Sequence, residues 1–169
     1  GYPGAKGMPP IRLQHTPGGK EVAEFVRAQI RVSLDVDVEL QEVSPEDYSE
    51  RLRSGNYTMA YYGFHADYPD PDNWLAETFG TSGSLNNARY SNPQFDELVS
   101  RAMAEPDERR RLGLWEEAQR LVVKDAAVIF LSHGRKVVLI KPYVKGLKPT
   151  LLDAFTGDRF WNEVYIAKP

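Results

Sequence analysis

The residues with the clearest chemical potential lie in one stretch, residues 57–74, which reads YTMAYYGFHADYPDPDNW. An apolar run from Tyr57 to Phe64 ends at His65, Ala66 and Asp67, and a loop with two prolines and three more polar residues follows. A histidine two residues from an aspartate could supply two ligands of one metal ion, or a general base and the acid that orients it. The aspartates of the loop equally suit turn formation. Spacing alone favours turn formation, then ligand binding, then catalysis, and leaves all three open.

Other catalytic constellations are missing from the sequence. The three histidines, His15, His65 and His133, fall in three different expected elements, and their spacing does not indicate a metal site. No serine stands in a nucleophile-elbow pattern, and no glycine-rich phosphate loop follows an expected strand. The absence of cysteine excludes disulfides, thiolate catalysis and cysteine-type zinc sites. We therefore expect no cofactor and no metal.

Composition limits the class of protein. The chain has 169 residues, of which 41% are hydrophobic and 27% charged, and these values suit one compact domain with a real core. A net charge of −3 provides no general attraction for a phosphate backbone, so we expect no nucleic-acid partner. No apolar segment approaches the roughly 18 to 20 residues that span a bilayer. The chain opens without Met and without a signal pattern, so we expect a processed or excised piece.

The first 64 residues indicate the elements that position the stretch at residues 57–74. Apolar residues at three- and four-residue steps predict an amphipathic helix over 20–34, and a period of two over 36–41 predicts a half-buried strand. Ser44 before Pro45 and Gly55 ten residues on bound a second helix. With strands expected at 11–15 and 57–64, the alternation predicts an α/β sheet flanked by helices. Ligands of such sheets lie beyond the carboxyl ends of the strands, which is where His65 and Asp67 follow their strand.

The second half of the chain is expected to be mainly helical. A short helix is expected over 74–79 and two longer ones after Asn92 and over 107–124. Their apolar faces are expected to hold Phe95, Leu98, Val99, Ala102 and Met103, and Leu112, Trp115, Ala118 and Val122. The arginines at 109–111 indicate a solvated face rather than an anion site, because cations oppose the dipole at a helix start. A hairpin of strands 128–131 and 137–140 around residues 132–135 is expected next.

Four consecutive blocks of the chain carry a resemblance to a known family. Residues 1–13, 39–75, 89–131 and 142–147 resemble, in the same order, blocks of the family 5 extracellular solute-binding proteins; the second block includes GFHADYPDPDNWL. These proteins are the oligopeptide- and dipeptide-binding components of bacterial ABC importers. The resemblance covers nearly the whole chain, and in the family such blocks lie in the C-terminal half of a much longer protein.

The resemblance implies a fold and a location. It implies that residues 1–169 are a single α/β lobe of a type II periplasmic-binding-protein-like fold, with a mixed sheet flanked by helices and 142–169 as a returning C-terminal segment. The second lobe of the same protein would then be missing from this chain. The full-length protein would be periplasmic or extracellular, with a lipid anchor as one option, and would work with a membrane permease of the ABC transporter.

The resemblance also implies a peptide site in the opening stretch. In peptide-binding members, the strand before a D-Y-x-x-P segment pairs with the main chain of an extended peptide, and the aspartate receives the peptide's ammonium group. Here Asp67 matches that aspartate, Gly63 and His65 would offer main-chain groups, and Phe64 would wall a side-chain pocket. The position of His65 varies in the family, and we expect its ring to face solvent. Gly63 could instead mark a bulge.

Other functions stay open at this point. Members of the same family carry nickel, haem, oligosaccharides or opines, and the aspartate alone does not separate these ligands from peptides. A sensor or interaction module built on the same lobe is a second alternative. A hydrolase that uses His65 and Asp67 is the least favoured, because no nucleophile is visible. We expect a binding protein and not an enzyme.

Overall fold

The structure of the protein is a computed structural model that describes residues 2, 5–134, 137–148 and 161–167. The chain divides into two compact units. The first, which we call the sheet unit, comprises Gly1–His65 and Asn87–Arg89. The second, the helical unit, comprises Ala66–Asn86 and Tyr90–Pro169. Whether residues 1–169 form one lobe of a larger protein stays a prediction.

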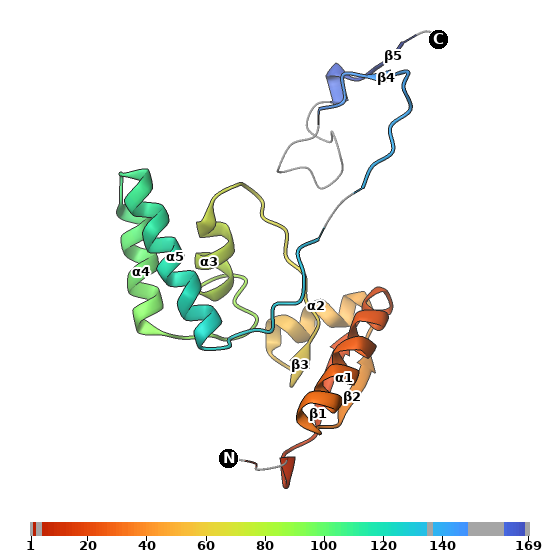
Figure 1. Cartoon of the computed structure of the whole chain (residues 1–169), viewed down its shortest axis with the longest axis vertical. Coiled ribbons are helices and arrows are strands. Elements are labelled where there is room, and N and C mark those ends of the chain that lie inside the picture. The colour runs from red at the N-terminus through yellow and green to blue at the C-terminus, as the bar shows by residue number, and fades with distance from the viewer. Residues whose placement is uncertain (1, 3–4, 135–136, 149–160, 168–169) are drawn as a thin grey trace. The chain divides into compact units, whose positions relative to one another are not determined.

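The sheet unit alternates strands and helices as the sequence predicts (Figure 1). Its three strands are all parallel and lie in the order β2-β1-β3, with Leu13 of β1 opposite Leu40 of β2 and Met59 of β3. The elements are β1 (Ile11–His15), a 3-10 turn (Pro17–Gly19), α1 (Lys20–Leu34), β2 (Val38–Glu42), α2 (Pro45–Ser54) and β3 (Met59–Ala60). This order is an α/β fold.

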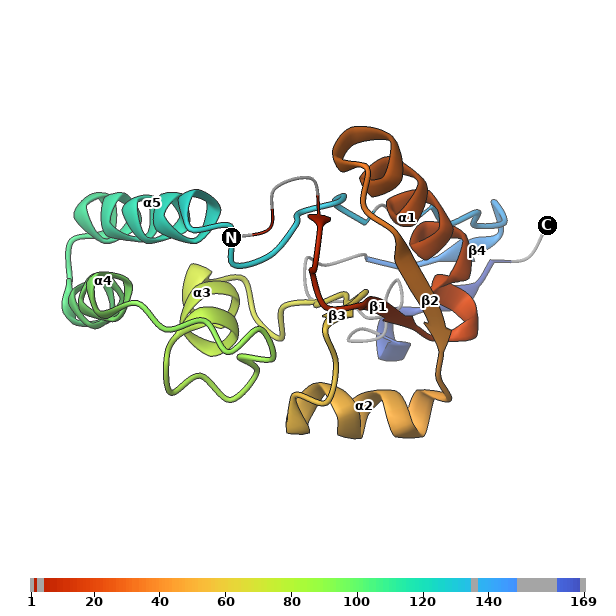
Figure 2. The same cartoon turned by 90° about the horizontal axis from the view of Figure 1, so that it is seen from below.

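Helices cover both faces of this sheet. Figure 2 shows α1 on one side of the strands and α2 on the other. On the α1 side, one buried cluster joins Leu13, Ala23, Val36 and Val38. A second cluster joins Val43 to two residues of α2, Tyr48 and Leu52. The apolar stripe of each helix therefore packs on the strands, and this burial is the main stabilising contribution for such a layered unit.

Both ends of α2 lie where the sequence places them. The Ser44 hydroxyl accepts a hydrogen bond from the Asp47 main-chain N–H at 3.2 Å, the bond expected of an N-cap. Gly55 ends the helix at φ 72°, a left-handed conformation that glycine adopts at least cost. A side chain at Gly55 would also collide with the guanidinium group of Arg89.

The helical unit is built on three packed helices. Helices α4 and α5 are joined by residues 105–107 and pack with α3 around one apolar core. Its elements are α3 (Pro71–Phe79), α4 (Pro93–Ala104), α5 (Glu108–Lys124), β4 (Val144–Lys145), a 3-10 turn (Trp161–Glu163) and β5 (Tyr165–Ile166). Strands β4 and β5 pair antiparallel. Among the described helices, none is both long and apolar enough to cross a membrane.

The core of the helical unit excludes two residues that the sequence predicts to be buried. Its buried residues are Leu75, Phe79, Phe95, Leu98, Val99, Ala102, Trp115, Ala118 and Val122. The placement of Met103 and Leu112 on the buried faces is wrong, because both side chains are exposed. The stripe from Phe95 to Ala102 already fills the space beside α5. Met103, one position further around the helix, therefore falls at its edge.

Two predicted strand regions differ from the structure. The strand expected over 57–64 is reduced to Met59–Ala60, because its partner β1 ends at His15 and the chain then turns through Pro17–Gly19. The hairpin expected from 128–131 and 137–140 is also wrong: both runs are described and neither forms a strand. Residue 135 of its turn lies outside the described residues, as does the part of 142–169 from 149 to 160. A strand needs a neighbour, which a hydrophobic pattern cannot supply.

Candidate functional site

The sheet unit holds Tyr61, the residue after β3, from two directions. Its main-chain N–H donates to the Gln14 carbonyl at 2.9 Å, which extends the pairing with β1 by one residue. Its carbonyl accepts a hydrogen bond from the Tyr48 hydroxyl. Burial raises the pKa of Tyr48 to about 12, so this hydroxyl keeps the proton that it donates. The segment after Tyr61 thus leaves the sheet from a fixed point.

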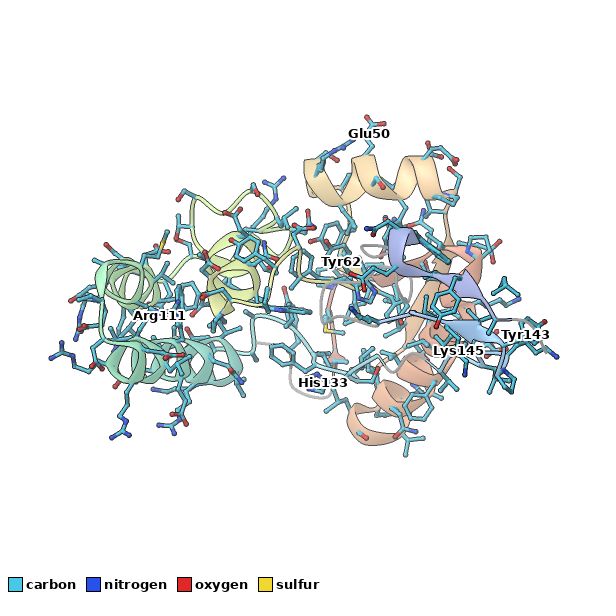
Figure 3. All side chains as sticks on the ribbon, turned by 90° about the horizontal axis from the view of Figure 1, so that it is seen from above. Glu50, Tyr62, Arg111, His133, Tyr143 and Lys145 are labelled. Carbon is cyan, nitrogen blue, oxygen red and sulfur yellow. The ribbon has the colours of Figure 1, made fainter. Side chains whose placement is uncertain are left out.

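Gly63, Phe64 and His65 end the first segment of the sheet unit. Gly63 and His65 are exposed, and no other described residue hydrogen-bonds to the main chain of either one. Phe64 is half-buried. Nothing lies within 4 Å of a side chain added at Gly63, and its φ is not positive, so the backbone does not itself require glycine there. Tyr62, labelled in Figure 3, immediately precedes these residues.

Asp67 lies at the start of the helical unit, and a buried asparagine holds its main chain. The side-chain oxygen of Asn73 accepts a hydrogen bond from the Asp67 N–H at 2.8 Å, and Asn73 is almost completely buried. The Asp67 side chain is exposed, and its carboxylate has no hydrogen bond or ion pair with another described residue. Sequence reasoning identified Asp67 but missed Asn73, whose role depends on burial that spacing does not reveal.

The two later aspartates of the loop are occupied in local structure. Asp70 caps α3 by accepting from the Asp72 N–H at 3.2 Å, and its carboxylate pairs with Arg111 of α5, with 2.8 Å from Oδ2 to Nη1. Burial works against ionisation, but these hydrogen bonds and the charge of Arg111 hold the pKa of Asp70 below its ordinary value. Asp72 accepts from the Tyr68 hydroxyl at 3.0 Å. Turn formation, the favoured interpretation of this loop, is confirmed for Asp70, which caps α3, whereas the Asp72 carboxylate bonds the Tyr68 side chain.

The three arginines at 109–111 also differ from one another in exposure and in their contacts. Arg109 and Arg110 are exposed, as expected of a solvated face. Arg111, labelled in Figure 3, departs from that expectation because it is half-buried and tied to Asp70. The pair joins the start of α3 to the first turn of α5, so the arginine serves the architecture of the helical unit.

Within the described residues, no group of three or more His, Asp or Glu side chains is placed to hold a metal ion. His15 is buried in β1, where its Nδ1 lies 2.9 Å from the Thr16 carbonyl oxygen. His65 and His133 are exposed and belong to different units. His65 and Asp67 also belong to different units. What this part of the chain offers chemically is exposed main-chain hydrogen-bonding groups and a single exposed carboxylate.

The comparisons with known proteins agree on one group of relatives. The chain is 30% identical over 142 residues to the dipeptide-binding protein DppE of Bacillus subtilis, covering 83% of this chain and 26% of that protein. It is 32% identical over 154 residues to the heme-binding protein A of Haemophilus influenzae, covering 88% of this chain and 28% of the relative. No protein-family model matches the chain.

A solved structure supports the same relationship. The periplasmic binding protein DppA of Helicobacter pylori, associated with an ABC transporter and solved with the peptide STSA, superposes with a TM-score of 0.80 at 27% identity. The match covers 94% of this chain and 31% of that one. The chain thus spans between a quarter and a third of the length of these relatives. With sequence and fold in agreement along nearly its whole length, the chain belongs to the family 5 extracellular solute-binding proteins.

Proposed function

We propose that the protein is the substrate-binding component of an ABC importer that captures oligopeptides or dipeptides, and that this chain forms one of its two lobes. The relatives support this proposal, since DppE is a dipeptide-binding protein and the DppA structure contains a peptide. The function is binding without turnover. An associated permease, a periplasmic or extracellular location and a lipid anchor in the full-length protein belong to the same proposal.

The observation that carries the proposal is the contrast among the three loop aspartates. Asp70 and Asp72 have partners in the helical unit, whereas the Asp67 carboxylate is exposed and has none among the described residues. The main chain of Asp67 is fixed by its hydrogen bond to Asn73, and its carboxylate has no partner among the described residues. A carboxylate in this situation suits recognition of a cation. Asp67 is therefore proposed to receive the ammonium group of the peptide.

The main chain before Asp67 supplies the rest of the proposed contact. Gly63 and His65 carry exposed N–H and C=O groups to which no described residue bonds, so an extended peptide can add to them as a strand. Such pairing uses groups common to all peptides and therefore tolerates varied side chains. Phe64 is proposed to wall a side-chain pocket, while the ammonium group at Asp67 sets the register.

Substitution of Asp67 in the full-length protein tests the proposal. The Asp67→Asn variant removes the charge and keeps the shape, so we expect peptide affinity to fall by about tenfold or more, equivalent to about 1.4 kcal/mol. Asp37→Asn is the control, because the Asp37 side chain is also exposed but precedes β2 and pairs with Arg31. Equal peptide affinity of the Asp67 variant and the parent, measured by titration calorimetry, would overturn the assignment.

Haem is the second candidate ligand, because a heme-binding protein is 32% identical to the chain. Parallel titrations of the full-length protein separate the two. Peptide binding appears as heat, and haem binding as a change in the Soret absorbance. If the protein binds haem tightly and di- to pentapeptides produce no heat, haem replaces peptide as the proposed ligand.

The isolated chain is expected to bind peptides weakly or below detection. In two-lobed binding proteins a hinge closes both lobes around the ligand, so one lobe supplies only part of the contacts. Titration calorimetry of the 169-residue chain with di- to pentapeptides checks this expectation. Sub-micromolar affinity would show that the chain does not need a second lobe.

A further inference from the structure

A buried glycine, Gly19, lies directly against the ring of Tyr61. Gly19 ends the 3-10 turn Pro17–Gly19 that connects β1 to α1. A Cβ atom placed on Gly19 would lie 2.8 Å from Cδ1 and 3.2 Å from Cε1 of the Tyr61 ring. Carbon atoms in van der Waals contact lie roughly 3.5 to 4.0 Å apart, so the ring leaves no room for a side chain at this position. Both residues belong to the sheet unit, and the contact is therefore internal to it.

The backbone at this position does not itself require glycine. Gly19 has φ −96° and ψ 0°, a conformation that is open to other residues. Its neighbour Gly18 stands in the same turn, and nothing lies within 4 Å of a Cβ added there. The restriction to glycine at position 19 therefore comes from the Tyr61 ring. Gly18 provides a reference for the effect of a side chain added to this turn without the ring contact.

The ring contact is the third restraint on Tyr61. Its main-chain N–H donates to the Gln14 carbonyl at 2.9 Å, and its carbonyl accepts from the Tyr48 hydroxyl. These two bonds hold the main chain, whereas contact with Gly19 fixes the ring. Cδ1 is separated from Cβ by a single ring atom, and an aromatic ring does not bend. A side chain at position 19 would therefore push the Tyr61 ring from its rotamer or displace the main chain of Tyr61.

We propose that Gly19 is a positioning residue of the peptide site, because it admits the Tyr61 ring and thereby fixes where the chain leaves β3. This inference rests on the proposed function. Only Tyr62, labelled in Figure 3, separates Tyr61 from Gly63, so a shift of Tyr61 reaches the main-chain groups of Gly63 and His65. Hydrogen bonds weaken steeply as their geometry departs from the optimum, and binding groups must be held to within about 0.5 Å.

Peptide affinity of the full-length protein is the first readout. Gly19→Ala is expected to lower the affinity for di- to pentapeptides by about fivefold or more in titration calorimetry, because the pairing groups are displaced. Gly18→Ala is the matched control and should stay within about twofold of the parent, since its added methyl group meets nothing. Equal affinities of Gly19→Ala and the parent would overturn the inference. Loss of the folded state in Gly19→Ala, seen by circular dichroism, would assign the contact to folding and would also overturn it.

Amide hydrogen exchange at residue 61 is the second readout, and it requires no ligand. This amide is bonded to the Gln14 carbonyl, so Gly19→Ala should accelerate its exchange by about fivefold or more, and Gly18→Ala should not. In the Tyr61→Ala background the ring is gone, and Gly19→Ala should have no further effect on this amide. Alanine is also a poorer N-cap than glycine at the start of α1, and that effect would appear equally in both backgrounds. An equal acceleration in both backgrounds would therefore contradict the role of the ring.

The two readouts separate this inference from the proposed function. If exchange at residue 61 responds as expected but the parent binds no peptide, the peptide proposal fails and the contact of Gly19 with Tyr61 still fixes the end of β3. If the parent binds peptides and Gly19→Ala binds them equally well, the positioning role fails alone.

Discussion

Replacing Asp70 by alanine would remove two interactions at the start of α3. The carboxylate caps the helix through the Asp72 N–H, and it meets Arg111 Nη1 at 2.8 and 2.9 Å through its two oxygens. The side chains of Asp70 and Arg111 are only 29% and 28% exposed. The pair is therefore partly shielded from water, and Asp70→Ala would leave a half-buried guanidinium without its partner.

The expected loss follows from these two contributions. An N-cap contributes about 1 kcal/mol. A charge-assisted pair contributes roughly 1.5 to 3 kcal/mol when well shielded, and about 1 kcal/mol at this degree of exposure. Asp70→Ala should therefore destabilise the chain by about 2 kcal/mol, which lowers the unfolding temperature by about 4 to 8 °C for a chain of this size.

Thermal unfolding followed by far-ultraviolet circular dichroism measures the loss of stability. A second variant separates the contribution of the N-cap from that of the ion pair. Asn caps a helix as well as Asp does, so Asp70→Asn should lose only the ion pair, about 1 kcal/mol. Arg110→Ala is the control, because the Arg110 side chain is exposed and its ion pairs should contribute about 0.5 kcal/mol or less. If Asp70→Ala lowers the unfolding temperature no more than Arg110→Ala does, the bonds of Asp70 do not contribute as argued.

Three further predictions concern Phe95, Asn73 and the pH dependence of the Asp70 contribution. Phe95→Ala should destabilise the helical unit by about 3 to 5 kcal/mol, because Phe95 is 0% exposed in its core; a loss below about 1 kcal/mol in urea unfolding would refute this. Asn73→Ala should weaken peptide binding by the full-length protein, since it frees the main chain of Asp67; calorimetry showing unchanged affinity would contradict that role. The lowered pKa of Asp70 means that its contribution to stability is present above about pH 4 and lost as pH falls through its folded-state pKa. Acid titrations should therefore show a smaller loss of stability in Asp70→Asn than in the parent, and identical curves would exclude the effect.

Local signals predicted the helices well. Ser44 and Asn92, each followed by proline, mark the starts of α2 and α4, and both side chains accept the expected capping bonds. Asp70 before Pro71 carries the same signature, so the start of α3 could have been placed at Pro71 instead of Trp74. These signals work because a cap contacts only residues two or three positions away.

Features that depend on distant partners could not be predicted. The strand expected over 57–64 is short because β1 ends at His15, which lies more than forty positions earlier in the chain. For the same reason, spacing could not separate Asp67 from Asp70, since the difference is made by Arg111 of α5. The sequence therefore predicted the order of elements as far as α5 and the loop of the candidate site. Tertiary contacts decide which aspartate of that loop stays without a partner among the described residues.

The division of the chain into units has a consequence for recombination. The short segment Asn87–Arg89 returns to the sheet unit, where the Asn87 carbonyl accepts from the Tyr57 hydroxyl and Arg89 donates to the Ser54 carbonyl. Consider a chimera of two homologues with one junction, after residue 65. In both hydrogen bonds, one partner would then come from the first parent and the other partner from the second. Exchanging a whole unit therefore requires two additional junctions, one on each side of residues 87–89. In a library of chimeras with a single junction, we expect the fraction of folded chimeras to fall as the parents differ more at these positions.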